Sequence, residues 1–141
     1  MKVAFDIGGV ISKYPDIFRV LMMQLQRAGV TVLVITDMHG HDEVIELLKL
    51  NDFDFVPPAN IHCADYDTHG EGCKAILCEE LGVDMFYDDF IGYTTAGGAP
   101  VRLLVMPDAT RPYYADNWKV PKETKFGRQR YTKRQVKGRD V

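Results

Sequence analysis

The stretch VAFDIGGVIS, residues 3–12, decides the fold of this chain. A short apolar run ends at a single carboxylate, Asp6, and two glycines, Gly8 and Gly9, follow almost at once. An apolar run bounded in this way indicates a strand buried on both faces, which we expect over residues 3–6. A carboxylate at the end of that strand can act as a nucleophile or hold a hard cation, and glycines let the backbone approach a phosphate closely.

The rest of the chain alternates between apolar β-type runs and helical patterns. We expect further strands over residues 30–36, 60–64, 84–87 and 101–106, and helices over residues 15–28, 42–50, 71–81 and 90–96. On the first of these helices the inner face is predicted to carry Ile17, Val20, Leu21, Leu25 and Ala28. The strands are too apolar for a half-solvated sheet, so the pattern predicts an α/β fold: a Rossmann-like three-layer α/β/α sandwich around a central parallel sheet.

Polar side chains follow three of the expected strands. Asp6, Thr36 and the pair Asp88–Asp89 all stand where a strand ends, and the carboxyl ends of parallel strands meet at one edge of the sheet. The Thr36 hydroxyl can bind phosphate oxygens, Lys74 can neutralise them, and the paired carboxylates are the oxygen ligands that Mg²⁺ prefers. These residues predict metal-assisted phosphoryl transfer at that edge.

The same four segments resemble the motifs of the haloacid dehalogenase-like superfamily, over about residues 2–106. The first motif is Asp6-Ile7-Gly8-Gly9-Val10 after a strand, and the second is "VLVIT" ending at Thr36. The third is Lys74, upstream of the fourth strand, and the fourth is "MFYDD", which ends in Asp88 and Asp89. The motifs stand in the family's order and spacing.

The resemblance implies a Mg²⁺-dependent phosphohydrolase that acts on a phosphomonoester through an aspartyl-phosphate. Asp6 would be the nucleophile, and Mg²⁺ would be held by Asp6, the Gly8 carbonyl and Asp89, with Asp88 as helper or alternative ligand. Thr36 and Lys74 would hold the transferred group, and the remaining phosphate-binding residues would be Gly8, Gly9 and Asp37.

Two features depart from the usual family pattern. Gly8 stands where phosphatases of the family carry a second Asp, which protonates the leaving group. Tyr14, Asp16 and His39 lie near the loops from which a replacement acid could come, and the sequence does not select one of them. Residues 51–70 are too few for a folded cap domain, so we expect an open site. The resemblance then implies a phosphorylated substrate that is large or nucleotide-like, or a second subunit that covers the site.

Charge divides the chain into an acidic domain, residues 1–118, and a basic tail, residues 119–141. The domain has eight Lys or Arg against 18 Asp or Glu, and the tail has nine against two. A second hypothesis follows: a phosphate- or nucleotide-binding module without turnover, whose tail binds nucleic acid or a protein partner. The tail could equally fold against the chain's own acidic body.

Other features bear on compartment and on metal binding. No apolar stretch is long enough to cross a membrane, and three cysteines without framework spacing favour a reduced, cytoplasmic setting. The stretch "IHCADYDTHGEGC", residues 61–73, holds histidines and cysteines but lacks paired zinc-ligand spacing, so we expect its polar residues to line the mouth of the site. Four residues near the rim either form a substrate wall or pack the tail down: Arg111, Tyr113, Tyr114 and Trp118.

Overall fold

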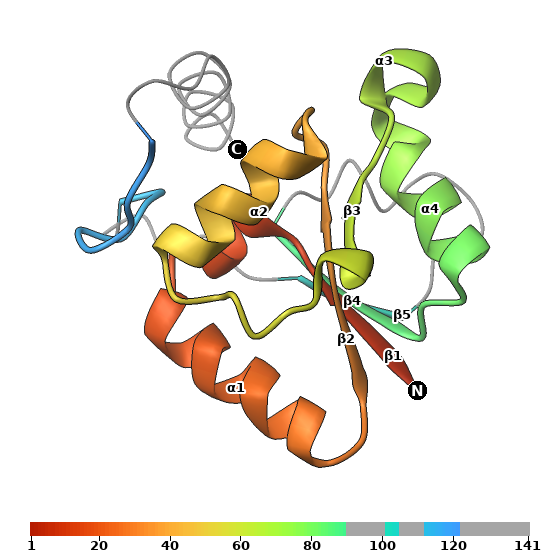
Figure 1. Ribbon diagram of the computed structural model, residues 1–141. Helices are drawn as coiled ribbons and strands as arrows, with labels where there is room; N and C mark the ends of the chain where they lie inside the picture. Colours follow the sequence, from red (N-terminus) through yellow and green to blue (C-terminus); the bar gives the residue numbers. More distant parts are fainter. Residues whose placement is uncertain (90–100, 105–111, 122–141) are drawn as a thin grey trace.

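A five-stranded parallel sheet forms the centre of the molecule (Figure 1). The computed structural model describes residues 1–89, 101–104 and 112–121. The strands lie in the order β3-β2-β1-β4-β5, and all four pairings between neighbours are parallel. Their bounds are β1 Lys2–Phe5, β2 Thr31–Thr36, β3 Ile61–Cys63, β4 Met85–Asp88 and β5 Val101–Leu104.

Helices cover both faces of the sheet, which confirms the predicted α/β architecture of the Rossmann-like kind (Figure 1). One face is covered by α1, Pro15–Arg27, and α2, His41–Leu50, and the other by α4, Cys73–Leu81. A short helix, α3, spans Tyr66–His69, and single 3₁₀ turns span Pro58–Asn60 and Gly70–Gly72. Residues Ile7–Ile11 form a turn whose backbone is not helical at Gly8 and Gly9. No helix in the described part of the chain is long and apolar enough to cross a membrane.

Alternate residues of each central strand point to opposite faces of the sheet and therefore to different helices. Val3 and Phe5 pack with the side chains of α1 and α2, whereas Ala4 between them packs with the α4 side of the core. The same alternation separates Val34 from Ile35 in β2. Both faces are buried, which is why the inner positions of β1 and β2 are apolar.

The predicted inner face of α1 is partly wrong. Ile17 and Val20 are each 62% exposed, and the residues that α1 buries are Phe18 and Met22 together with Pro15. Leu21 and Leu25 do pack against the core, but Ala28 is exposed. Apolar residues lie nearly all round this helix, so its sequence is compatible with two overlapping apolar faces. The face that contacts the sheet is the one with Phe18 and Met22, not the predicted one with Ile17 and Val20.

The remaining expectations differ mainly at their ends. The expected helix over residues 71–81 begins two residues later, at Cys73, and α3 lies outside the ranges that were expected to be helical. Strand β3 is shorter than the range 60–64. The helix expected over residues 90–96, Arg111, and the tail from residue 122 onward lie outside the described residues.

The segment of residues 112–121 packs against the α2 side of the core (blue in Figure 1). Trp118 is buried, with its ring centroid 6.3 Å from that of Phe53. Asn51, at the end of α2, accepts a hydrogen bond from the Lys119 amide (2.7 Å) and donates one to the Lys119 carbonyl (2.8 Å). Of the two roles considered for Trp118, packing is therefore the one that these contacts support.

Candidate active site

Asp6 lies one residue beyond β1, at the carboxyl edge of the sheet and in its centre. Its backbone amide still donates to the Tyr87 carbonyl in β4 (2.9 Å), so the strand alignment continues through this position. The side chain is only 1% exposed, and its Oδ1 accepts a hydrogen bond from the Ile7 amide at 2.8 Å. The strand thus fixes the carboxylate where water has little access.

Strand β4 delivers two more carboxylates to the same place. Asp88 is the last residue of β4 and is fully buried, and Asp89 follows it with partial burial. Because β1 and β4 are neighbours in the sheet, one carboxylate oxygen from each of Asp6, Asp88 and Asp89 lies within 4.8 Å of the other two. Among the described residues, this is the one group of three or more metal-ligating side chains.

Lys74 lies between two of these carboxylates. It is the second residue of α4 and is fully buried, with Nζ 3.0 Å from Asp6 Oδ1 and 3.4 Å from Asp88 Oδ2. A buried ammonium group is costly unless it is paired, and both carboxylates pair with it. Taken together, the three carboxylates and this ammonium carry a formal charge of −2.

The turn after Asp6 brings the backbone against Asp89. Gly9 has φ +74°, a conformation that side chains disfavour, and a Cβ at this position would overlap the Asp89 carboxylate. Gly8 has an ordinary φ of −64°. The Gly9 amide donates to the buried Ser12 hydroxyl at 2.9 Å, which closes the turn.

Ser12 was not identified from the sequence as part of this site. Its hydroxyl binds Gly9, and its carbonyl accepts a hydrogen bond from the Ala115 amide at 2.8 Å, so it also joins the turn to the segment of residues 112–121. The sequence signal is only a small hydroxyl residue three positions after a glycine in a turn, which is a common pattern.

The end of β2 carries Thr36 and Asp37, next to β1 in the sheet. Thr36 is 1% exposed, and its hydroxyl accepts a hydrogen bond from the Met38 amide at 3.2 Å. Asp37 is also buried. Burial raises the pKa of the Cys73 thiol, Lys74 lowers that pKa, and the negative charge of Asp37 raises it. Asp37 therefore lies within electrostatic reach of Cys73, the first residue of α4.

The three candidates for a replacement acid lie in different surroundings. Asp16 is on the first turn of α1, is 79% exposed in its side chain, and forms an ion pair with Arg19 at 3.0 Å. His39 follows β2 and lies 3.1 Å from the Asp67 carboxylate of α3. Tyr14 packs near Phe18, with ring centroids 6.5 Å apart. The ion-pair partners of Asp16 and His39 are therefore Arg19 and Asp67 rather than Asp6.

The histidines and cysteines of residues 61–73 also have separate surroundings. His41 Nε2 lies 2.9 Å from the Ile61 carbonyl and 3.1 Å from that of Pro58. Burial lowers the pKa of His62, and burial together with the charge of Glu43 raises the pKa of the Cys63 thiol. At neutral pH these two groups are therefore uncharged.

No family model, no curated protein and no solved structure matches the chain. What the chain does must therefore be inferred from its own side chains. At the edge of the sheet these are three carboxylates, one buried amine and a turn with two glycines.

Proposed function

We propose that the chain is a capless member of the haloacid dehalogenase-like superfamily and a Mg²⁺-dependent phosphohydrolase acting on a phosphomonoester. The observation that carries the proposal is the cluster of Asp6, Asp88 and Asp89 within 4.8 Å, with Lys74 placed between Asp6 and Asp88. A purely structural cluster of this kind would be costly, because it places three like charges, two of them buried, around one counter-charge.

The donor set suits Mg²⁺. Carboxylate oxygens are the ligands this ion prefers, and it commonly takes one or two of them together with phosphate oxygens and water. A divalent cation would also balance the formal charge of −2 on the four side chains. When bound, the ion would screen the negative charges of nucleophile and phosphate from each other.

Asp6 would attack the phosphorus atom and form the aspartyl-phosphate as the bond to the ester oxygen breaks. Its burial and its hydrogen bond from the Ile7 amide hold the carboxylate in one orientation for that attack. Lys74 would stabilise negative charge on the transferred group, and Thr36 would bind its oxygens from the neighbouring strand. A water molecule would then hydrolyse the acyl-phosphate and release inorganic phosphate.

The leaving oxygen needs a proton unless the alcohol it becomes is already a good leaving group. Gly8 has no side chain to supply one, and general acid catalysis is worth about 10²–10⁴ in rate. The proposal therefore includes a preference for esters with good leaving groups, such as aryl phosphates, over alkyl phosphates.

A panel of aryl and alkyl phosphate esters with Mg²⁺ tests the proposal. Asp6→Asn should abolish phosphate release, because an amide cannot form the acyl-phosphate. Asp54→Asn, the same chemical change at an exposed loop position, should leave the rate unchanged. Activity that survives Asp6→Asn would contradict the mechanism.

Gly8 itself favours a second candidate function, a phosphate- or nucleotide-binding module without turnover. Its φ of −64° and ψ of 125° are accessible to any residue, so Gly8→Asp introduces no backbone strain. If the parent chain releases no phosphate and Gly8→Asp releases it readily, the second candidate is correct for the parent. If the parent turns over aryl phosphates, the first is correct.

A further inference from the structure

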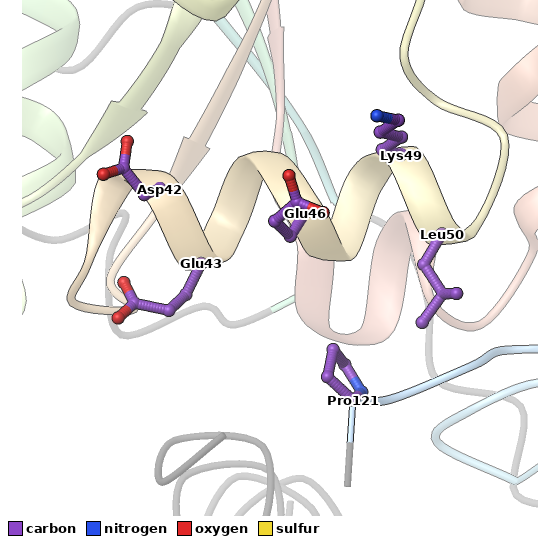
Figure 2. Close-up of a pocket in the computed structure, with 6 residues that line it drawn as sticks. All are labelled: Asp42, Glu43, Glu46, Lys49, Leu50 and Pro121. Atoms are coloured by element: carbon purple, nitrogen blue, oxygen red, sulfur yellow. The ribbon is translucent and has the colours of Figure 1, made fainter. Parts of the chain in front are cut away.

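The outer face of α2 forms an open groove of about 660 Å³ (Figure 2). Three acidic side chains lie along it, from Asp42 and Glu43 at the start of the helix to Glu46 one turn later. The other end is bounded by Leu50, which is 41% exposed, and by Pro121 from the far end of the described chain. Acidic groups thus extend from one end of the groove to its middle, and the described chain ends at the other end.

We propose that the basic segment after Pro121 docks in cis in this groove. The segment of residues 122–141 has eight Lys or Arg and two Asp or Glu, a net charge of +6. The groove residues Asp42, Glu43 and Glu46 against Lys49 carry a net charge of −2. The charges of segment and groove are therefore complementary, and the apolar surface between Leu50 and Pro121 is covered when the chain continues along it.

The segment after Pro121 starts at one end of the groove and is long enough to reach the acidic residues at the other. Trp118 in the core and the two Lys119–Asn51 hydrogen bonds fix the chain beside the end of α2, so the described chain ends, at Pro121, on the Leu50 side of the groove. From Leu50 back to Asp42 the helix rises about 12 Å, at 1.5 Å per residue. About four extended residues cover that distance, which corresponds to residues 122–125 with Lys122 and Lys125.

Tethering decides which copy supplies the segment. Because residue 121 already lines the groove, the residues after it meet the groove at millimolar effective concentration. Exposed ion pairs are individually weak, so the tethered segment occupies the groove where a free one would not. None of the proposed catalytic residues takes part, so the inference does not depend on the proposed function.

Limited trypsin digestion of the full chain tests the docking, with cleavage after Lys125 followed by intact mass. The double variant Asp42→Asn/Glu46→Gln should be cut about fivefold faster than the parent, since it removes two exposed pairing partners. About 1 M NaCl, which shortens the Debye length to about 3 Å, should speed cleavage of the parent similarly, after correction with a short peptide substrate.

The matched control is Glu79→Gln/Glu80→Gln, which makes the same charge change on exposed positions of α4. It should leave the cleavage rate unchanged. Equal rates for the parent and the Asp42/Glu46 variant would overturn the proposal. So would protection that disappears on about a hundredfold dilution, because mass action then identifies the segment of a second copy as the occupant.

Discussion

At Gly9 the absence of a side chain lets two parts of the candidate site meet. The residue has φ +74°, and any Cβ would overlap the Asp89 carboxylate. We expect Gly9→Ala to lower the free energy of unfolding by about 1–2 kcal/mol from the left-handed backbone. Displacing Asp89 adds about 1–3 kcal/mol, as in other overpacked sites. Urea denaturation measures the sum.

The variant Gly82→Ala separates the cost of backbone strain from the cost of overlap with Asp89. Gly82 has φ +68°, close to the value at Gly9, but a Cβ there would have nothing within 4 Å. This variant should therefore show only the backbone contribution of about 1–2 kcal/mol. If both variants lose the same stability, the close approach of Asp89 to the turn has no energetic consequence.

Single residues differ in how far the sequence predicts their place. Asp6, Thr36 and the pair Asp88–Asp89 could be placed at one edge because each ends an apolar strand, and parallel strands end together. The contact of Gly9 with Asp89 could not be predicted, because it depends on a positive φ and on two segments far apart in the chain. Ser12 was missed because its role is one hydrogen bond within a turn.

At the scale of elements, buried strands were easier to predict than amphipathic helices. A strand with both faces buried is apolar throughout, so β2 lies within one residue of its expected range. In α1, by contrast, apolar residues cover more than the buried face, and only contact with the sheet decides that Phe18 rather than Ile17 points inward. Helix α3 has four residues, too few to show a period.

One polar side chain, Asn51, makes two of the hydrogen bonds that hold the segment of residues 112–121. Asn51 is 4% exposed, binds both backbone groups of Lys119, and donates to the Leu47 carbonyl at 2.9 Å. Asn51→Ala would leave the Lys119 amide and carbonyl without this partner, at a cost of about 1–3 kcal/mol. We expect that loss in urea denaturation, with a red shift of the emission of Trp118, the only tryptophan.

Asn117→Ala is the matched control, because Asn117 lies in the same segment but is exposed. Its stability and emission should match those of the parent. An Asn51→Ala variant with unchanged emission would show that Trp118 stays in the core without the hydrogen bonds, and that Phe53 and its neighbours hold the segment.

On the scale of the whole molecule, strand order decides which carboxylates meet. The sequence predicts a common edge, but not that β1 lies between β2 and β4. That order follows from pairings between residues far apart in the chain, such as Phe5 with Val34 and with Tyr87. It places Asp6 beside Asp88 and Asp89 on one side and Thr36 on the other. The site therefore depends on the order of the strands as well as on the residues at their ends.

A cation held by this cluster would join two central strands, so its binding should stabilise the entire domain. At a Mg²⁺ concentration about 100 times its dissociation constant, linkage adds about 2.7 kcal/mol, which is a rise in Tm of about 10 °C for a domain of this size. Thermal denaturation with and without Mg²⁺ measures the shift. Asp89→Asn should reduce it strongly, whereas Asp54→Asn should keep it in full. A parent Tm that does not respond to Mg²⁺, or an Asp89→Asn variant that responds equally, would show that these carboxylates do not bind the ion, whatever activity the chain has.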